Sequence, residues 1–320
     1  MRQLAYVQAI QEALAEELER DEKVFLVGEA VQAGVFGATT GLTKKFGKER
    51  IMDTPLAETA IGGIGFGAAV AGYRPVADFM FADFMPIAFN EITNNSAKWY
   101  FNHGGKVSCP VVWFACCGAG AGVASEHSQT PEGYYMHTPG LKLAVPSTPY
   151  DAKGLLKTAI RDNNPVVFFY HKRLLGLMGD VPEEEYTIPL GVADVKKEGT
   201  DVTVIAIMHM VQHALAIAAK MEGEISVEVV DPRTLSPLDI DTIVKSVKKT
   251  GRVVIVDEDV KMCGPAAGIA TQIMEEAFDS LKVPIKRVAA KHMPIPGGPL
   301  EKYAIPQPEE IAAAIKAVAG

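Results

Sequence analysis

Apolar residues recur along the chain at two spacings, one typical of helices and one typical of buried strands. Val7, Ile10, Leu14 and Leu18 stand three or four residues apart, which predicts an amphipathic helix near the start of the chain. A second helix is predicted over 149–161. Short continuous apolar segments predict strands, namely VFLVG (24–28), RPVADFMF (74–81), PVVWFACC (110–117), KLAVPS (142–147) and PVVFFYH (165–171). Strands that are apolar throughout and alternate with helices favour an α/β fold with a parallel sheet covered on both faces.

The apolar pattern lapses after Leu174 and resumes after Glu198 as a second alternating series. The lapse is rich in charge, proline and glycine, which is typical of a domain boundary. We therefore predict one domain over 1–185, a linker over 186–198 and a smaller α/β domain over 199–320. The strands predicted for the second domain are 201–207, 226–231, 252–258 and 284–289, and its helices are 212–221, 239–249, 266–281 and 308–319.

Length and charge narrow the range of functions. A chain of 320 residues with 48% hydrophobic residues can bury two apolar cores, and its apolar excess favours an oligomer. A formal net charge of -8 argues against a nucleic-acid partner, which would need a clustered basic face. The sequence contains no apolar run of membrane-spanning length, and it opens on an acidic amphipathic segment. We therefore expect a cytoplasmic protein that is mature from Met1.

Two glycine-rich segments could carry chemistry or serve packing. Gly118–Gly122, after the strand PVVWFACC, is similar to the opening of a dinucleotide fingerprint, but its third glycine comes one position early. A nicotinamide-dependent oxidoreductase therefore stays open only as an alternative. The other segment, Gly62–Gly72, follows no predicted strand, and its small residues favour close packing of a helix against a sheet or a partner.

Two side chains near these glycines are candidates for catalysis. Glu58 directly precedes the small-residue helix, where it would be partly desolvated or would simply favour the helix N-terminus. His127 follows the glycine segment 118–122, so it could lie in a loop at the edge of the sheet or be a hydrogen-bonded structural residue. The residues by themselves therefore indicate a large α/β enzyme and leave its site open.

Longer stretches carry a more specific signal. They include DTPLAETAIGGIGFGAAVAGYRPVADFMFADF, NNSAKWYFNHGGK, GAGAGVASEHSQ, PGLKLAVPSTPYDAKGLLKTAIRDNNPVVF and DPRTLSPLD. In this order they resemble the β subunits of the thiamine-diphosphate-dependent E1 enzymes of pyruvate, acetoin and branched-chain 2-oxo acid dehydrogenases, within the transketolase-like superfamily. The resemblance covers nearly the whole chain. It implies a pyrimidine-binding parallel-sheet domain followed by a smaller transketolase C-terminal-like domain.

The resemblance assigns roles to three residues. Glu58 matches the carboxylate that hydrogen-bonds the aminopyrimidine ring of the cofactor and favours the imino form, which removes the proton from the reactive thiazolium carbon. A partly desolvated carboxylate suits this contact. Phe84 matches the aromatic residue that packs on the aminopyrimidine and orients it. His127 matches a histidine thought to assist proton transfers of the substrate or the lipoyl group, which suits an imidazole near neutral pH.

Three further positions have a weaker match. Glu29 matches an acidic cofactor-proximal position, with a role in proton communication between paired sites, although a plain strand-end acid explains it equally well. Asp162 and Asn164 match a loop that in some relatives helps to hold a structural potassium ion. Hard oxygen ligands suit an alkali cation, but a turn before Pro165 explains the same residues.

An absent motif indicates what the partner must supply. In this superfamily a GDG motif followed by asparagine holds the Mg²⁺ of the cofactor's diphosphate, and this chain contains no GDG. The resemblance therefore implies a separate α subunit that binds the diphosphate and Mg²⁺, in an α2β2 heterotetramer. It also implies a lipoyl-bearing acyltransferase, E2, as a further partner.

The sequence thus predicts an E1 β subunit that helps to cleave a small 2-oxo acid or acetoin and to pass the acyl group to lipoamide. The segments VPSTPYDAKGLLK and HKRLLG favour pyruvate or acetoin over branched-chain substrates. Three alternatives remain. They are the C-terminal half of a split transketolase-like enzyme, the nicotinamide-dependent oxidoreductase, and a non-catalytic β scaffold in which Ser125-Glu126 beside His127 has abolished turnover.

Overall fold

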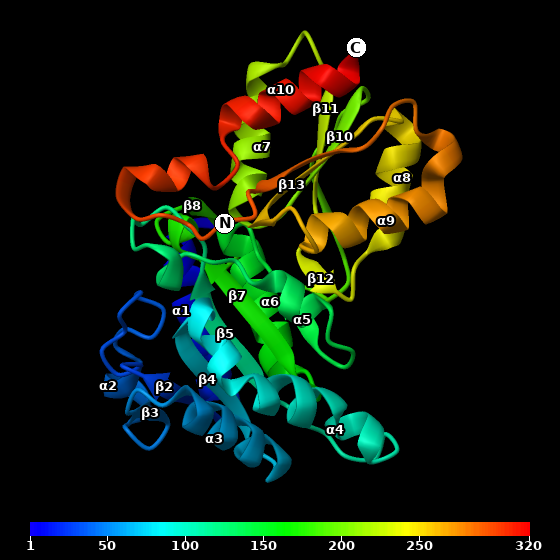
Figure 1. Cartoon of the computed structure of the whole chain (residues 1–320). Coiled ribbons are helices and arrows are strands. Elements are labelled where there is room, and N and C mark those ends of the chain that lie inside the picture. Colours follow the sequence, from blue (N-terminus) through cyan, green and yellow to red (C-terminus); the bar gives the residue numbers. More distant parts are fainter. The chain divides into compact units, whose positions relative to one another are not determined.

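The chain forms two compact units, and the structure, a computed structural model, describes all residues from 1 to 320 (Figure 1). The first unit is Met1–Cys117 with Tyr134–Leu190, and the second is Gly118–Gly133 with Gly191–Gly320. Residues 118–133 therefore group with the C-terminal half of the chain. Strand β9 (Asp194–Lys197) lies inside the predicted linker 186–198.

The first unit is built around a parallel sheet. The strands of this unit are β1 (Arg2–Ala5), β2 (Val24–Glu29), β3 (Ile51–Thr54), β4 (Arg74–Phe81), β5 (Val112–Cys117), β6 (Lys142–Ala144), β7 (Val166–His171) and β8 (Met178–Val181). Its helices are α1 (Tyr6–Arg20), α2 (Leu42–Phe46), α3 (Glu58–Val70), η1 (Ala82–Ala88), η2 (Asn90–Ser96), α4 (Ala97–Asn102), α6 (Pro149–Arg161) and η4 (Lys172–Leu174), while η3 (Ser125–His127) and α5 (Glu132–Met136) come between β5 and β6 in the chain. The strand order β6-β7-β5-β4-β2-β3 is parallel throughout, and β1 pairs antiparallel with β8.

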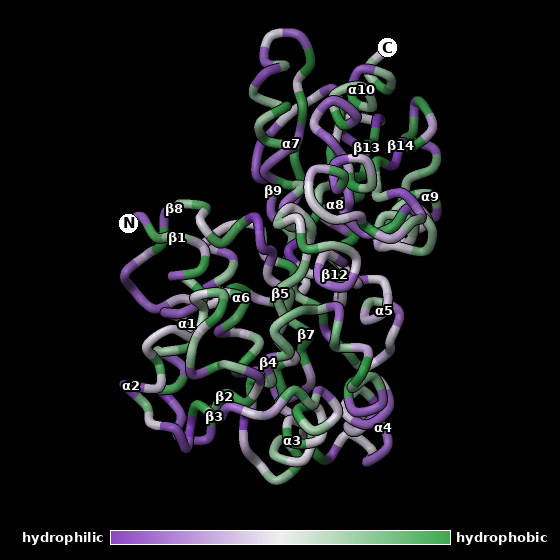
Figure 2. The backbone as a smooth tube through the Cα atoms, turned by 60° about the vertical axis from the view of Figure 1, so that its left-hand side comes forward, coloured by the Kyte–Doolittle hydropathy of each residue, from purple (hydrophilic) through white to green (hydrophobic).

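Helices cover both faces of this sheet, as the apolar pattern predicts. Along β5, Phe114 and Cys116 belong to the apolar core that also contains Leu14 of α1 and Leu155 of α6. Trp113 points to the other face, where a Cβ atom at Gly65 of α3 would lie 2.8 Å from its ring. Every residue of β5 and β7 is buried, and β4 is buried over its middle five residues, as expected for strands covered on both faces (Figure 2).

The second unit has its own sheet and core. Its elements are β9, β10 (Val202–Ala206), α7 (His209–Lys220), β11 (Val227–Asp231), β12 (Thr234–Ser236), α8 (Ile240–Thr250), β13 (Val253–Val260), α9 (Pro265–Ala277), η5 (Phe278–Ser280), β14 (Lys286–Ala290), η6 (Gly298–Tyr303) and α10 (Pro308–Ala319). The sheet order is β14-β13-β10-β11-β9, in which only β9 is antiparallel. Apolar residues of α7 and α10 pack on β10 and β13. No helix of the chain combines the length and the apolar character that crossing a bilayer requires.

Buried ion pairs join α1 to α6 in the first unit. The carboxylate of Glu17 has no exposed area. It accepts hydrogen bonds from Arg161, at 3.0 and 3.1 Å from Nε and at 2.6 Å from Nη2, and one from Nε of Arg20 at 2.7 Å. Lys153 and Lys157 are also buried, and both bind Glu16. The Glu16 carboxyl has a lowered pKa because its hydrogen bonds to these lysines outweigh the cost of its partial burial.

Replacing Arg161 by methionine should destabilise the first unit. The substitution removes the bidentate partner of a fully buried carboxylate and leaves Glu17 its hydrogen bond from Arg20 at 2.7 Å, so we expect the free energy of unfolding to fall by about 2 kcal/mol. Lys45→Met is the control because it breaks a pair with Glu19 in which both side chains are about half exposed, and we expect a loss below about 1 kcal/mol. Denaturant unfolding of both variants measures the difference, and equal losses would contradict a special role for the buried pair.

Candidate functional site

Three predicted site residues lie at or just after the carboxyl ends of adjacent strands in the first unit. Glu29 is the last residue of β2, Glu58 is the first residue of α3 after β3, and Phe84 lies in η1 directly after β4. Because β4, β2 and β3 are neighbours and parallel, their carboxyl ends lie at one edge of the sheet. This edge is where open α/β folds bind their ligands.

The two glutamates at this edge influence each other electrostatically. Burial raises the pKa of Glu29, and the negative charge of Glu58 raises it further. The structure therefore brings these two predicted residues close together. Both side chains are half-buried, so an incoming group can reach a carboxylate that already lies partly out of water.

Phe84 belongs to a series of aromatic contacts at the same edge. The ring of Phe84 is half-buried and meets Phe81 edge-on, with 6.0 Å between ring centroids, and Phe81 in turn meets Phe36 edge-on at 5.1 Å. Such edge contacts orient rings relative to each other. Phe84 is thereby held by packing and not left as a freely rotating surface residue.

Asp78 is a residue of this edge that the sequence reasoning did not identify. It lies in β4, its exposure is 7%, and it lines a small cavity together with Glu29, Met80 and Tyr170. Burial raises the pKa of Asp78 to about 7, although a hydrogen bond from the Met80 amide partly opposes the shift. The available signal was an acidic residue inside an otherwise apolar strand, RPVADFMF.

The loop predicted to hold potassium has one feature that favours a cation and others that oppose it. The side-chain oxygen of Asn164 is buried without a hydrogen-bond partner, which a cation would satisfy. However, the Asp162 carboxylate binds Lys142 and accepts a hydrogen bond from the Asn164 amide, and the main-chain oxygen of Asp162 accepts one from Arg74 at 2.9 Å. A potassium ion at the Asp162 oxygens would have to compete with two side-chain cations.

His127 lies in the second unit, in a segment that begins with the glycine loop Gly118–Gly122. The three glycines of this loop have φ values of 91°, 101° and 72°, a region that side-chain-bearing residues rarely adopt. The alternating glycines are therefore required by the backbone conformation. His127 ends the short helix η3 and is half-buried, and its amide hydrogen-bonds the oxygen of Ala124 at 3.3 Å.

The amide groups of the glycine loop already donate to carboxylates of the same unit. The Gly120 and Gly122 amides donate to Glu301 at 3.0 and 2.9 Å, and the Ala119 amide donates to Glu258 at 2.6 Å. A dinucleotide pyrophosphate would need such amides for itself. The structure therefore disfavours the alternative of a nicotinamide site on this loop.

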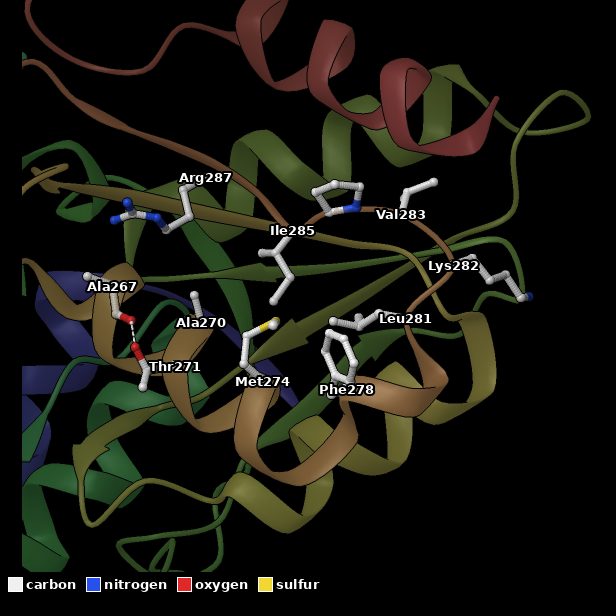
Figure 3. A pocket seen from close by; sticks show the side chains of 11 residues that line it. Ala267, Ala270, Thr271, Met274, Phe278, Leu281, Lys282, Val283, Ile285 and Arg287 are labelled. Atoms are coloured by element: carbon white, nitrogen blue, oxygen red, sulfur yellow. Dashed lines mark hydrogen bonds between the residues drawn. The ribbon is translucent and has the colours of Figure 1, made fainter.

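A separate cavity of about 640 Å³ lies in the second unit between α9 and the segment that leads into β14. Figure 3 shows Met274 and Phe278 on one side and Leu281 and Ile285 on the other, with Arg287 at one end. The cavity contains none of the predicted site residues.

Comparison with known proteins assigns a family description to each half of the chain. Residues 2–178 match the family described as transketolase, pyrimidine binding domain, and residues 191–311 match transketolase, C-terminal domain. Together the two matches cover most of the chain.

Three relatives are similar to this chain over almost the full length of both proteins. The chain is 46% identical to the 2-oxoisovalerate dehydrogenase subunit beta of Bacillus subtilis, with 100% of this chain and 99% of the relative covered. It is also 46% identical to the acetoin:2,6-dichlorophenolindophenol oxidoreductase subunit beta of Cupriavidus necator, over 98% and 97%. Identity to the pyruvate dehydrogenase E1 component subunit beta of Bacillus subtilis is 45%, over 97% of each.

A solved structure has the same fold. A split gene transketolase, described as an inactive beta4 tetramer, matches with a TM-score of 0.81 and 25% identity, over 99% of this chain and 98% of that chain.

Replacing Asp78 by asparagine should change how stability depends on pH. Because folding raises the pKa of Asp78, its favourable contribution is present at low pH and is lost as the pH rises to about 7. Asparagine cannot ionise and keeps an acceptor for the Met80 amide. From pH 5 to pH 8 we expect the variant to gain up to about 3 kcal/mol of unfolding free energy relative to wild type.

Denaturant unfolding at both pH values tests this expectation. Asp279→Asn, at an exposed position in η5, is the control and should keep a constant difference from wild type. A difference for Asp78→Asn that does not change with pH would show that the carboxyl ionises normally in the folded protein.

Proposed function

Because the chain belongs to the family of transketolase-like β subunits of 2-oxo acid and acetoin dehydrogenases, we propose that it forms an E1 enzyme with an α subunit. This enzyme uses thiamine diphosphate to cleave a small 2-oxo acid or acetoin and transfers the acyl group to the lipoamide of an E2 acyltransferase. The observation that carries the proposal is the grouping of Glu29, Glu58 and Phe84 at the carboxyl edge of the first sheet.

The residues of this edge suit the aminopyrimidine end of the cofactor. A ring nitrogen needs a carboxylate that can share a proton, and Glu58 supplies one in a half-buried position beside a second acid. The aromatic face needs an apolar neighbour, and Phe84 supplies a ring held by Phe81. When bound, thiamine diphosphate supplies the nucleophilic carbon that cleaves the bond next to a carbonyl.

In this role Glu58 would share a proton with the ring nitrogen of the cofactor, and Phe84 would pack against the ring and orient it. Glu29, whose pKa is raised by burial and by Glu58, can hold or release a proton next to that pair. We propose that His127 serves acyl transfer to the lipoyl group. An imidazole suits that step because it can give and take a proton near neutral pH.

The α subunit is proposed as the binder of the diphosphate and its Mg²⁺, since the chain contains no GDG motif. An exposed apolar surface on the first unit supports a partner. On α3, Ile64 and Val70 are 38% and 37% exposed, and a Cβ atom at Gly63 or Gly67 would meet no atom within 4 Å. Exposed apolar side chains and open glycine positions on one helix suit a protein–protein contact.

The similarity to known proteins indicates the type of reaction more closely than it indicates the substrate. The three relatives named above carry the names of 2-oxoisovalerate, acetoin and pyruvate enzymes. Their sequences are 46%, 46% and 45% identical to this chain, so sequence identity does not discriminate among these substrates. The proposal favours pyruvate or acetoin because of the segments VPSTPYDAKGLLK and HKRLLG. The second candidate, half of a split transketolase, is supported by the fold match at a TM-score of 0.81. It predicts activity on sugar phosphates instead.

Substituting Glu58 by glutamine should abolish turnover of the assembled enzyme. The chain is co-expressed with a candidate α subunit that carries GDG, and dye reduction is measured with pyruvate, acetoin, branched 2-oxo acids and a sugar phosphate. Loss of the proton-sharing carboxylate should lower kcat by about 100-fold or more. Glu49→Gln, at an exposed position before β3, is the control and should retain activity.

The outcomes separate the candidates. Cofactor binding that needs both chains, together with a Glu58→Gln loss, supports the E1 assignment, and the best substrate names the enzyme. Full activity of Glu58→Gln would place the pyrimidine contact elsewhere. Activity on the sugar phosphate alone would favour the split transketolase, and an assembled but inert complex would favour the scaffold.

The potassium proposal has its own test. If Asn164 holds a potassium ion, exchanging NaCl for KCl at equal ionic strength should raise the melting temperature of the wild type through ligand linkage. Asn164→Ala should remove this gain, whereas Asn163→Ala, at an exposed neighbouring position, should keep it. Equal melting temperatures of the wild type in the two salts would rule out a stabilising potassium ion.

A further inference from the structure

Glu301 binds the glycine loop and the segment that carries His127 at several points. Its two carboxylate oxygens accept hydrogen bonds from separate loop amides, Oε2 from Gly120 at 3.0 Å and Oε1 from Gly122 at 2.9 Å. Oε1 also accepts a longer bond from the Ser128 hydroxyl at 3.4 Å. All four residues belong to the second unit, so these contacts are internal to one compact body.

The contacts of Glu301 enclose His127. Gly122 precedes the histidine by five positions and Ser128 directly follows it, and both donate to the same carboxylate oxygen. The chain between them turns at Ala124, which has a φ of 66° and so adopts a conformation that alanine rarely adopts. A backbone of this kind persists only when surrounding contacts hold it, and Glu301 supplies contacts on both sides of it.

A second set of contacts also holds the loop. The Glu258 carboxylate accepts a hydrogen bond from the Ala119 amide at 2.6 Å. The Gly298 amide donates a hydrogen bond to the main-chain oxygen of Gly122 at 3.1 Å. Gly298 begins η6, the helix that carries Glu301. The loop is therefore clamped by β13 and η6, which come more than a hundred residues later in the chain.

The burial of Glu301 makes its charge effective. The residue is 6% exposed, so water screens its carboxylate little, and charge-assisted bonds to amides are stronger there than at a surface. Glycines alternate in this loop with positive φ values, and a backbone of this kind can present neighbouring amides to an anion. In this protein an internal carboxylate is that anion, as a bound phosphate is elsewhere.

From these contacts we infer that Glu301 is a positioning residue for acyl transfer, because it fixes the loop that places His127. The inference rests on the proposed function, in which His127 serves transfer of the acyl group to lipoamide. Glu301 itself does not touch the reacting atoms in this role. Its effect reaches the reaction through the loop backbone, so it should act on the step that uses His127 and spare cofactor activation at Glu58.

The test compares Glu301→Gln, Glu301→Asp and His127→Gln in the assembled α and β complex with thiamine diphosphate and Mg²⁺. Two rates are measured, reduction of an artificial dye, which bypasses the lipoyl group, and acylation of free lipoamide. Glutamine keeps one acceptor oxygen but turns a donor toward an amide. We expect Glu301→Gln to lower lipoamide acylation by roughly tenfold or more while dye reduction falls much less, because small displacements of a catalytic group are costly.

Hydrogen exchange of the β chain supplies a readout that does not depend on activity. The Gly120 and Gly122 amides should lose protection in Glu301→Gln and less so in Glu301→Asp, whereas amides of α7 should be unchanged. Glu309→Gln, at an exposed position in the first turn of α10, is the matched control and should match wild type in every measurement.

Each outcome decides the inference. Selective loss of lipoamide acylation together with loss of loop protection supports it. Unchanged protection of Gly120 and Gly122, or an equal fall in both rates with a lower melting temperature, overturns it in favour of no role or a purely structural one. If the wild-type complex reduces no dye with any 2-oxo acid or acetoin, the proposed function fails, and the exchange experiment then decides separately whether Glu301 holds the loop.

Discussion

Parallel pairing of fully buried strands is the constraint on which the rest of this protein depends. A parallel strand must be reconnected through a helix, so helices cover both faces of the sheet and the strands become apolar along their whole length. The same arrangement places all carboxyl ends at one edge. Glu29, Glu58 and Phe84 share that edge because each ends or follows a different one of three adjacent strands, β2, β3 and β4.

Three buried carboxyl groups of the two units have different kinds of hydrogen-bond partners. Glu17 is paired with arginine and ties α1 to α6. Glu301 is paired with neutral amides and holds the glycine loop. Asp78 accepts an amide hydrogen bond, but burial dominates and raises its pKa to about 7. For Asp78 burial therefore favours the protonated form, because a single amide donor does not offset the loss of water around the carboxyl.

The glycine loop shows how one sequence pattern can serve different chemistry. Glycines after a buried strand supply exposed amides in a concave backbone, which suits a phosphate group. Here Glu258 and Glu301 accept hydrogen bonds from amides of the loop, and these bonds fix the position of the residues that follow it. The distinguishing feature is the carboxylate that faces the glycines, and it lies far away in the sequence.

The sequence by itself determined the α/β class, the two series of strands and helices, and the family. Element positions followed from periodicity, because burial of one helix face or of a whole strand dictates which positions are apolar. The helix predicted over 212–221 is α7 (His209–Lys220), and the one predicted over 266–281 is α9 (Pro265–Ala277) followed by η5. The candidate functional residues came from resemblance, since an isolated glutamate or histidine has several ordinary explanations.

Only the tertiary structure decided which distant residues meet. The sequence could not show that residues 118–133 group with the C-terminal half, because the bonds that hold them come from Glu258 and Glu301. It also could not show that β9 joins a sheet from within a charged segment, since an edge strand needs no apolar pattern. The raised pKa of Asp78 depends on desolvation by the strands and side chains around it. Local patterns record which residues are buried, whereas the partners of buried polar groups are chosen by contacts between segments far apart in the chain.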